Sequence, residues 1–141
     1  MGEQGARRAL EVKLSFEVKT YDIDFAGIVS NIVYIRWLED MRLAILAAHL
    51  PISAQIQSGI GPAIIKTEIQ YKRPLTIHDE VEGRMWVESV GKARYFLAAE
   101  FTTGNTTAAV AKQEGCFFGL ERKRPISLPT ALVEAYERSV G

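Results

Sequence analysis

The sequence is poor in the residues that build disulfides and metal sites. It contains one cysteine, Cys116, and two histidines, His49 and His78. A single cysteine excludes an intrachain disulfide and leaves no cysteine cluster for zinc. The two histidines are far apart in the chain, and neither lies near a serine or cysteine in a recognisable nucleophile motif. Ser-His and Cys-His triads and a two-histidine metal site are therefore poorly supported, and we expect neither a metal nor another cofactor.

An excess of either charge sign is also missing. Lys+Arg and Asp+Glu both number 17, and a general nucleic-acid-binding protein would normally show a basic excess. No apolar run approaches the roughly 18 residues of a membrane-spanning helix. The first residues carry two arginines but no apolar segment, which is not the pattern of a secretion signal. We expect a cytoplasmic protein that binds neither nucleic acid nor membranes.

What is present indicates one ordinary folded domain. The chain has 141 residues, of which 48% are hydrophobic and 24% charged, as in globular proteins. There is no internal repeat, no low-complexity segment and no linker. We therefore predict a single domain over 1–141 with a core at about 10–130.

The first two elements have clear periods. Residues 10–18 alternate between apolar and polar side chains, which predicts a half-buried strand. Residues 31–49 have helical spacing without internal Pro or Gly, and their apolar residues extend most of the way around the helix. A helix this apolar should be enclosed by the rest of the protein, and one long helix wrapped by a sheet is the natural solution.

The remaining chain is mostly strands. Pro51 and the segment 59–62 mark a loop. Alternation and turn residues predict strands over about 65–72, 81–90, 94–103 and 107–120, and residues 131–136 have helical spacing. Strands segregated from one long helix indicate an α+β fold, with an antiparallel sheet around the helix.

The segment between the first strand and the long helix carries the chemistry. Asp24 lies in a turn three residues before Gly27, and an apolar helix follows directly. The unpaired N–H groups at a helix start favour negative charge, so a carboxylate there suits attack on a carbonyl. A purely structural role for Asp24, as a helix cap or turn residue, is about equally compatible with this pattern.

Several motifs in order resemble one family. The pattern D-x-D-x-x-G-[IV]-V-x-N-x-x-Y is formed by Asp22, Asp24, Gly27, Ile28, Val29, Asn31 and Tyr34. Together with Arg36–Arg42 (RWLEDMR), Tyr71-x-x-Pro74 with Asp79, and Gly119–Pro129, it resembles the 4-hydroxybenzoyl-CoA thioesterase family of hotdog-fold proteins. The similarity spans nearly the whole chain, from about residue 10 to residue 130.

The resemblance implies a hotdog fold, in which five antiparallel strands wrap around one helix. It also implies homodimers whose sheets join edge to edge, commonly paired into homotetramers. The family hydrolyses acyl-CoA thioesters without a metal, and CoA enters as part of the substrate. Its catalytic carboxylate corresponds to Asp24, and its oxyanion donor is a main-chain N–H that corresponds to Asn31.

Other residues are weaker candidates for substrate contacts. Gly27 permits a backbone conformation or close approach that a side chain would block. Tyr34 is more typical of a core residue than of an acyl contact. Lys92 and Arg94 flank a turn, where they are either CoA phosphate ligands or solvated charges. A basic run, Arg122–Arg124, is open to the same two interpretations.

The sequence leaves several alternatives open. Asp24 acts either as a nucleophile or as a general base that activates water. The acyl group is aromatic or aliphatic, and the assembly is a dimer or a tetramer. Two rival functions are hydrolysis of acyl groups on acyl-carrier protein and acyl-CoA binding without catalysis.

Overall fold

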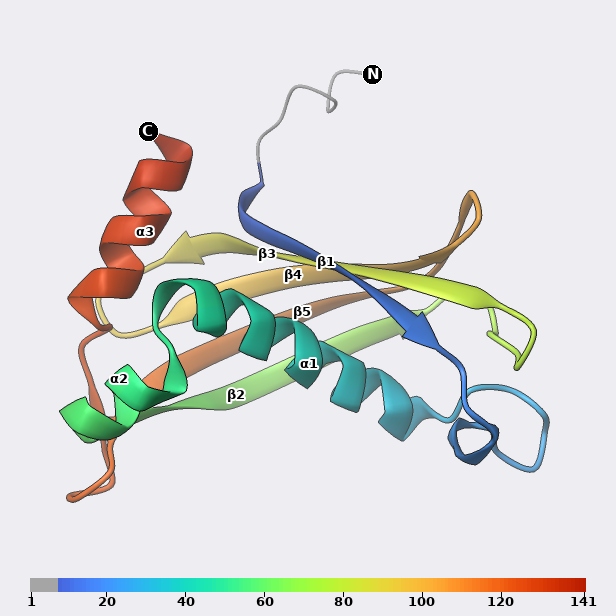
Figure 1. Ribbon diagram of the computed structural model, residues 1–141, viewed down its shortest axis with the longest axis horizontal. Coiled ribbons are helices and arrows are strands. Elements are labelled where there is room, and N and C mark those ends of the chain that lie inside the picture. The colour runs from blue at the N-terminus through green and yellow to red at the C-terminus, as the bar shows by residue number, and fades with distance from the viewer. Residues whose placement is uncertain (1–7) are drawn as a thin grey trace.

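An antiparallel sheet curves around one long helix, and the strand order is β1-β3-β4-β5-β2, with β6 paired to β5 outside this path (Figure 1). The structure is a computed structural model that describes residues 8–141. Its elements are β1 (Ala9–Glu17), the 3-10 turn η2 (Thr20–Asp22), α1 (Asn31–His49), α2 (Ile52–Ser58), β2 (Ile60–Tyr71), β3 (Glu80–Val90), β4 (Tyr95–Thr103), β5 (Thr106–Gly119), β6 (Arg124–Ile126) and α3 (Thr130–Val140).

The core lies between α1 and the concave face of the sheet. Leu38 and Met41 of α1 are fully buried, as are Phe101 of β4 and Phe117 of β5. Aromatic rings fill the end of this core nearest the start of α1. There the Trp37 ring stacks on a ring of β1, and Phe101 lies 5.8 Å from Trp37 between ring centroids. The predicted α+β hotdog arrangement is therefore confirmed.

The long helix is only partly enclosed, which corrects one prediction. Its sheet-facing side is buried, but Ile32, Ile35 and Leu43 are between 43% and 57% exposed. The sequence shows which helix residues are apolar, but it does not show whether this chain or another molecule covers them. One side of α1 therefore exposes apolar side chains that no part of this chain covers within residues 8–141.

Two short elements depart from the predicted loops. The segment between Pro51 and Gly59 forms helix α2 instead of an open loop. Gly59 ends it with φ +68°, a left-handed conformation that glycine adopts without strain. The polar stretch after β5 contains β6, three residues long, which pairs Phe117 with Ile126.

The C-terminal helix α3 packs against the start of β1. Leu10 has φ +56° at a register shift in the β1–β3 ladder, an unusual conformation for a leucine. Its N–H donates to the Ser139 side-chain oxygen at 3.2 Å. This contact joins the first strand to the last helix, and Figure 1 shows β1 and α3. Among residues 8–141, no helix has the length and apolar character needed to cross a membrane.

Candidate active site

The loop that carries Asp24 is a tight, hydrogen-bonded turn between η2 and α1. Ile23 and Val29 face each other in an isolated antiparallel bridge. Within it, the Asp24 N–H donates to the Ile28 carbonyl at 2.9 Å, and the Gly27 N–H donates to the Asp24 carbonyl at 3.0 Å. Gly27 has φ +81°, which any other residue would adopt only with strain. The glycine predicted to be special is therefore required by the turn itself.

Neighbouring segments fix this loop in place. The Val29 N–H donates to the Leu75 carbonyl at 2.8 Å, and the Ser30 N–H donates to the Asp22 carbonyl at 2.9 Å. The Asp22 carboxylate is buried and accepts the Lys19 N–H at 2.9 Å. Asp22 therefore stabilises the segment that leads into the loop, and this structural role does not require the Asp24 carboxylate.

Among the described residues, only one of the two Asp24 carboxylate oxygens accepts hydrogen bonds. Its Oδ1 accepts N–H groups of Ala26 at 2.8 Å and Ile28 at 3.4 Å. Its Oδ2 has no hydrogen-bond partner within residues 8–141, and the residue is exposed. One oxygen is thus held in a fixed orientation while the other is free to accept a proton or attack an electrophile.

The start of α1 offers hydrogen-bond donors near the loop. Ser30 is the N-cap, but its side chain makes no capping hydrogen bond. The Val33 N–H returns to the Ser30 carbonyl at 3.0 Å. The N–H groups of Asn31 and Ile32 find no acceptor in the described part of the chain. Unpaired N–H groups at a helix start are suited to bind an oxyanion.

Tyr34 lies in the core. Its side chain is buried, and its ring makes edge-to-face contacts with Trp37, Tyr71 and Phe101 at centroid distances of 5.4, 5.1 and 5.3 Å. Burial raises the pKa of Tyr34 to about 12, so the phenol stays neutral near pH 7. The structure thus gives Tyr34 a packing role one helical turn from Asn31, and its contact with a substrate stays a prediction.

Lys92 and Arg94 are far from Asp24 within one chain. They lie in the β3–β4 turn, beyond the C-terminal end of α1, whereas Asp24 precedes its N-terminus. The 19 residues of α1 span about 28 Å. Arg94 forms an ion pair with Glu114, and the Lys92 carbonyl accepts the Leu128 N–H at 3.1 Å. One chain therefore does not bring these cations to its own Asp24.

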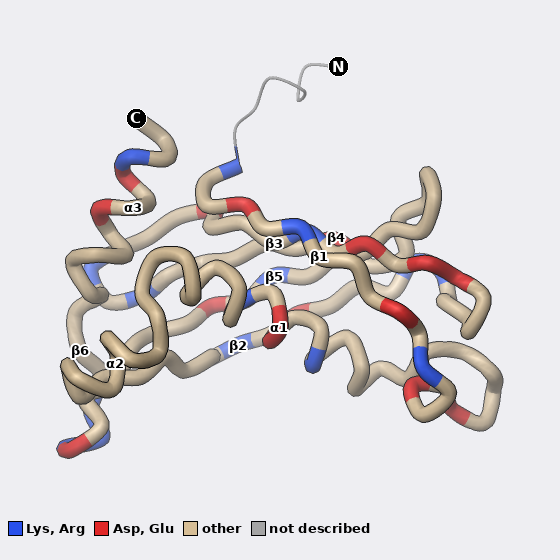
Figure 2. Tube along the Cα trace, viewed as in Figure 1, with Lys and Arg blue, Asp and Glu red and all other residues tan. Residues whose placement is uncertain are grey.

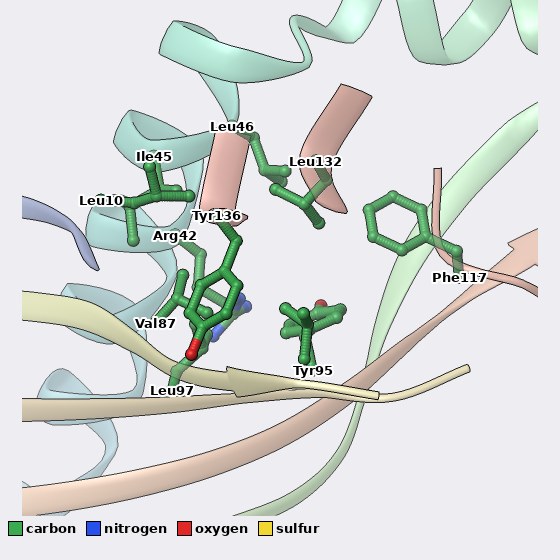
Figure 3. Close-up of a pocket in the computed structure, with 11 residues that line it drawn as sticks. Leu10, Arg42, Ile45, Leu46, Val87, Tyr95, Leu97, Phe117, Leu132 and Tyr136 are labelled. Atoms are coloured by element: carbon green, nitrogen blue, oxygen red, sulfur yellow. The ribbon is translucent and has the colours of Figure 1, made fainter. Parts of the chain in front are cut away.

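A partly open apolar cavity also lies at that far end (Figure 3). Side chains of α1, the sheet and α3 surround it, including Ile45, Tyr95, Leu132 and Tyr136. Its volume is about 30 Å³, which is small for an acyl group, and it lies at the opposite end of α1 from Asp24. Within one chain, this cavity is therefore not beside Asp24.

An open groove of mixed polar and apolar character lies at the Asp24 end, although Asp24 itself does not line it. The end of β1, η2 with Tyr21, and the connection from Ile77 to Glu80 line it. Phe25, whose side chain is fully exposed directly after Asp24, was not among the predicted site residues. An aromatic residue in an otherwise small and polar turn was the available signal. In the described part of the chain, no three His, Cys, Asp or Glu side chains gather as a metal site would require.

Comparison with known proteins places this geometry in context. The model of the thioesterase-like superfamily matches residues 18–136. The solved structures that share the fold include three that are named as CoA thioesterases. A DHNA-CoA thioesterase from Staphylococcus aureus has 20% identity and a TM-score of 0.83, covering 91% of this chain and 89% of its own. A 1,4-dihydroxy-2-naphthoyl-CoA thioesterase from Synechocystis has 16% identity and a TM-score of 0.82, covering 93% and 98%.

The third structure, a gentisyl-coenzyme A thioesterase, has 24% identity and a TM-score of 0.79, covering 86% of this chain and 99% of its own. No curated protein sequence matches the chain. At these identities, the solved structures support the fold alone.

Proposed function

Because the chain belongs to the thioesterase-like superfamily and has its hotdog fold, we propose that it hydrolyses an acyl-CoA thioester to a free acid and CoA. We keep the narrower assignment to the 4-hydroxybenzoyl-CoA thioesterase family, and a cytoplasmic location, as parts of this proposal. Two observations support it: Asp24, in the loop that leads into α1, has a free Oδ2, and the N–H groups of Asn31 and Ile32 at the start of α1 are unpaired within residues 8–141.

Two routes use this arrangement. In the first, Asp24 takes a proton from water while the water oxygen attacks the thioester carbonyl carbon. The carbonyl becomes an oxyanion, which the Asn31 N–H stabilises. The C–S bond then breaks, and the departing CoA thiolate takes the proton back. In the second route, the Asp24 carboxylate attacks directly and expels the thiolate, and water hydrolyses the resulting anhydride.

The substrate proposal combines charge and comparison. The three similar structures bear the names of thioesterases for hydroxylated aromatic acyl groups, which favours an aromatic acyl group here. Acidic side chains gather at the Asp24 end of the chain, where Lys19, Lys72 and Arg73 also lie, while Lys92, Arg94 and the Arg122–Arg124 run lie at the other end (Figure 2). We propose that the active form is a homodimer or homotetramer in which a second chain supplies further cations for the polyanionic CoA.

Replacement of Asp24 by Asn tests the role of the carboxylate. We expect turnover to fall by roughly 10² to 10⁴ because the variant lacks the base or nucleophile. Asp40→Asn, which changes an exposed carboxylate on α1, is the matched control and should keep full activity. The assay is thiol release from aromatic, short aliphatic and long aliphatic acyl-CoAs. Equal rates for wild type and Asp24→Asn would refute the assignment.

One rival function is acyl-CoA binding without catalysis. That rival predicts calorimetric binding of acyl-CoA with no thiol release by the wild-type chain. Hydrolysis on acyl-carrier protein instead predicts faster release from the carrier than from CoA. The same panel therefore separates all three functions.

A further inference from the structure

The connection between β2 and β3 contains a compact turn, residues 76–79, that borders the Asp24 loop (Figure 1). The Asp79 N–H donates to the Thr76 carbonyl at 3.1 Å and closes the turn. The Asp79 carboxylate also returns to Thr76, where its Oδ2 accepts the main-chain N–H at 2.7 Å and the hydroxyl at 3.2 Å. A carboxylate and a main-chain N–H form a charge-assisted hydrogen bond, which is stronger than one between neutral groups. Asp79 therefore fixes the orientation of the Thr76 N–H.

The Thr76 N–H belongs to the same peptide group as the Leu75 carbonyl. A peptide group is planar, so a contact that fixes its N–H also fixes its C=O. The Leu75 carbonyl accepts the Val29 N–H of the Asp24 loop at 2.8 Å. Leu75 and Val29 are 1% and 3% exposed, so water competes poorly for this hydrogen bond. The Asp79 carboxylate and the Val29 N–H are thus bound to opposite sides of one rigid peptide group.

A second peptide group continues the connection to Asp24. The Val29 N–H shares its peptide group with the Ile28 carbonyl, which accepts the Asp24 N–H at 2.9 Å. Three hydrogen bonds in series therefore join the Asp79 carboxylate to the Asp24 main chain, and we call this series the Asp79 relay. Hydrogen bonds in series polarise and strengthen one another. The Ile28 N–H also lies 3.4 Å from the Asp24 Oδ1, so the relay ends beside the carboxylate.

We propose that Asp79 is a positioning residue for the reaction, and that the Asp79 relay holds the Asp24 carboxylate in the geometry that the chemistry needs. The inference rests on the proposed function for what Asp24 does, whereas the relay itself rests on hydrogen bonds alone. Asp79 acts through main-chain groups and takes no part in attack or proton transfer. A turn that only began β3 would need no contact with the Asp24 loop.

The loop has a second anchor, which predicts how loss of the relay would appear. The Ser30 N–H donates to the Asp22 carbonyl at 2.9 Å, and this contact joins the two ends of the loop without Asp79. Loss of Asp79 should therefore loosen the middle of the loop without unfolding it. A displacement of about 1 Å in a reacting group can cost about 10²-fold in rate. The loss should fall on kcat, because the Asp24 carboxylate acts in the transition state.

Amide hydrogen exchange tests the relay without reference to activity. Asp79→Ala should speed exchange of the Asp24 and Val29 N–H groups by at least about tenfold, because their hydrogen bonds open more often. The Ser30 N–H lies outside the relay and should exchange at the wild-type rate. Asp79→Asn should protect all three groups, since its amide oxygen can still accept the Thr76 N–H. Unchanged exchange at Asp24 and Val29 in Asp79→Ala, or an equal increase at Ser30, would overturn the relay.

Thiol release tests the positioning role. Asp79→Ala should lower kcat by about 10- to 100-fold with KM changed by less than about threefold, and Asp79→Asn should restore most of the rate. Asp40→Ala, the same change at an exposed aspartate of α1, should act like wild type. Thr76→Val leaves the Asp79 carboxylate in place and removes only the hydroxyl contact. It should lower kcat by about two- to tenfold, which keeps the proposal testable if Asp79→Ala does not fold.

A double-mutant cycle separates positioning from a general structural effect. In an Asp24→Asn background the carboxylate that Asp79 positions is absent, so adding Asp79→Ala should lower the residual rate by less than about twofold. A residue that only stabilised the fold would lower the rate by the same factor in both backgrounds. Urea unfolding confirms that each variant is folded under assay conditions. Equal factors in the two backgrounds would overturn the positioning role.

These measurements also separate the inference from the proposed function. An active enzyme that is unaffected by Asp79→Ala would refute the positioning role and leave the thioesterase assignment intact. A wild-type chain that releases no thiol would overturn the proposed function and the positioning role together, while the exchange rates would still decide whether the relay exists.

Discussion

The polar contact between α1 and the sheet permits a worked prediction. Arg42 is half-buried, and burial lowers its pKa, yet no carboxylate pairs with it within residues 8–141. The Arg42 guanidinium donates a hydrogen bond to the side-chain oxygen of Gln113, which is 5% exposed. Gln113 in turn donates to the Thr67 hydroxyl at 3.0 Å. Gln113→Leu therefore leaves the guanidinium and the Thr67 hydroxyl without their partner. Arg42→Met instead leaves the Gln113 amide oxygen without its donor.

The magnitudes follow from the cost of unpaired polar groups. A buried group that loses its partner costs about 1–3 kcal/mol, and partial exposure of Arg42 favours the lower half of that range. We expect each single variant to lower the unfolding free energy by about 1–2 kcal/mol. For a chain of this size, that is a melting temperature lower by roughly 3–8 °C. Replacing both partners by apolar residues of similar volume should be nearly neutral.

The assay is a double-mutant cycle from urea unfolding curves of wild type, the two single variants and the double variant. The double variant should recover at least about 1 kcal/mol relative to the sum of the two single effects. Leu43→Met, a substitution on the exposed side of α1, controls for general changes in the helix and should change stability by less than about 0.5 kcal/mol. Additive single effects would show that the Arg42–Gln113 contact contributes nothing specific.

Three further predictions concern packing, pH and metals. Gly115→Ala should destabilise the fold by about 1–3 kcal/mol in urea, because its Cβ would lie 2.3 Å from the buried Tyr95 ring, whereas Gly119→Ala meets only an ordinary 3.7 Å contact and should not. Burial raises the pKa values of Tyr34 and Tyr95 to about 12, so stability is complete below the unfolded tyrosine pKa of 10 and is lost as pH rises toward 12. Ultraviolet titration should show two phenols ionising well above pH 10, and complete ionisation of the tyrosines near pH 10 would contradict the burial of Tyr34 and Tyr95. Prolonged dialysis against a chelator should leave thiol release unchanged, since the proposed reaction uses Asp24 and main-chain N–H groups; loss of activity restored by a divalent metal would refute that mechanism.

Elements with a strong period were predictable from the sequence. The alternation in residues 10–18 and the helical spacing from Asn31 to His49 gave β1 and α1 nearly to the residue, because each buries one continuous apolar side. Helix α2 was missed although its signals were present. Pro51 at its N-cap and a left-handed Gly59 after it are typical helix ends, but two turns are too short to show a period.

The site was predictable only in its local parts. The turn around Asp24 and Gly27 follows from neighbouring residues, so the sequence indicated it. The position of Lys92 and Arg94 at the far end depends on how the whole sheet folds, and spacing in the sequence does not encode that distance. The exposure of Ile32, Ile35 and Leu43 was unpredictable for a related reason. Apolar periodicity reports that a surface is to be covered, but it does not report by which molecule.

The hydrogen bond between Leu10 and Ser139 has a consequence for how the chain can be rearranged. Because the first strand and the last helix already touch, a short Gly/Ser bridge would be enough to fuse them, and the chain could be reopened elsewhere. The β4–β5 hairpin is a suitable place, since Gly104 and Asn105 form an exposed turn on the outside of the sheet. Such a circular permutant would begin with β5 and end with β4, yet it would retain every strand pairing apart from the opened connection.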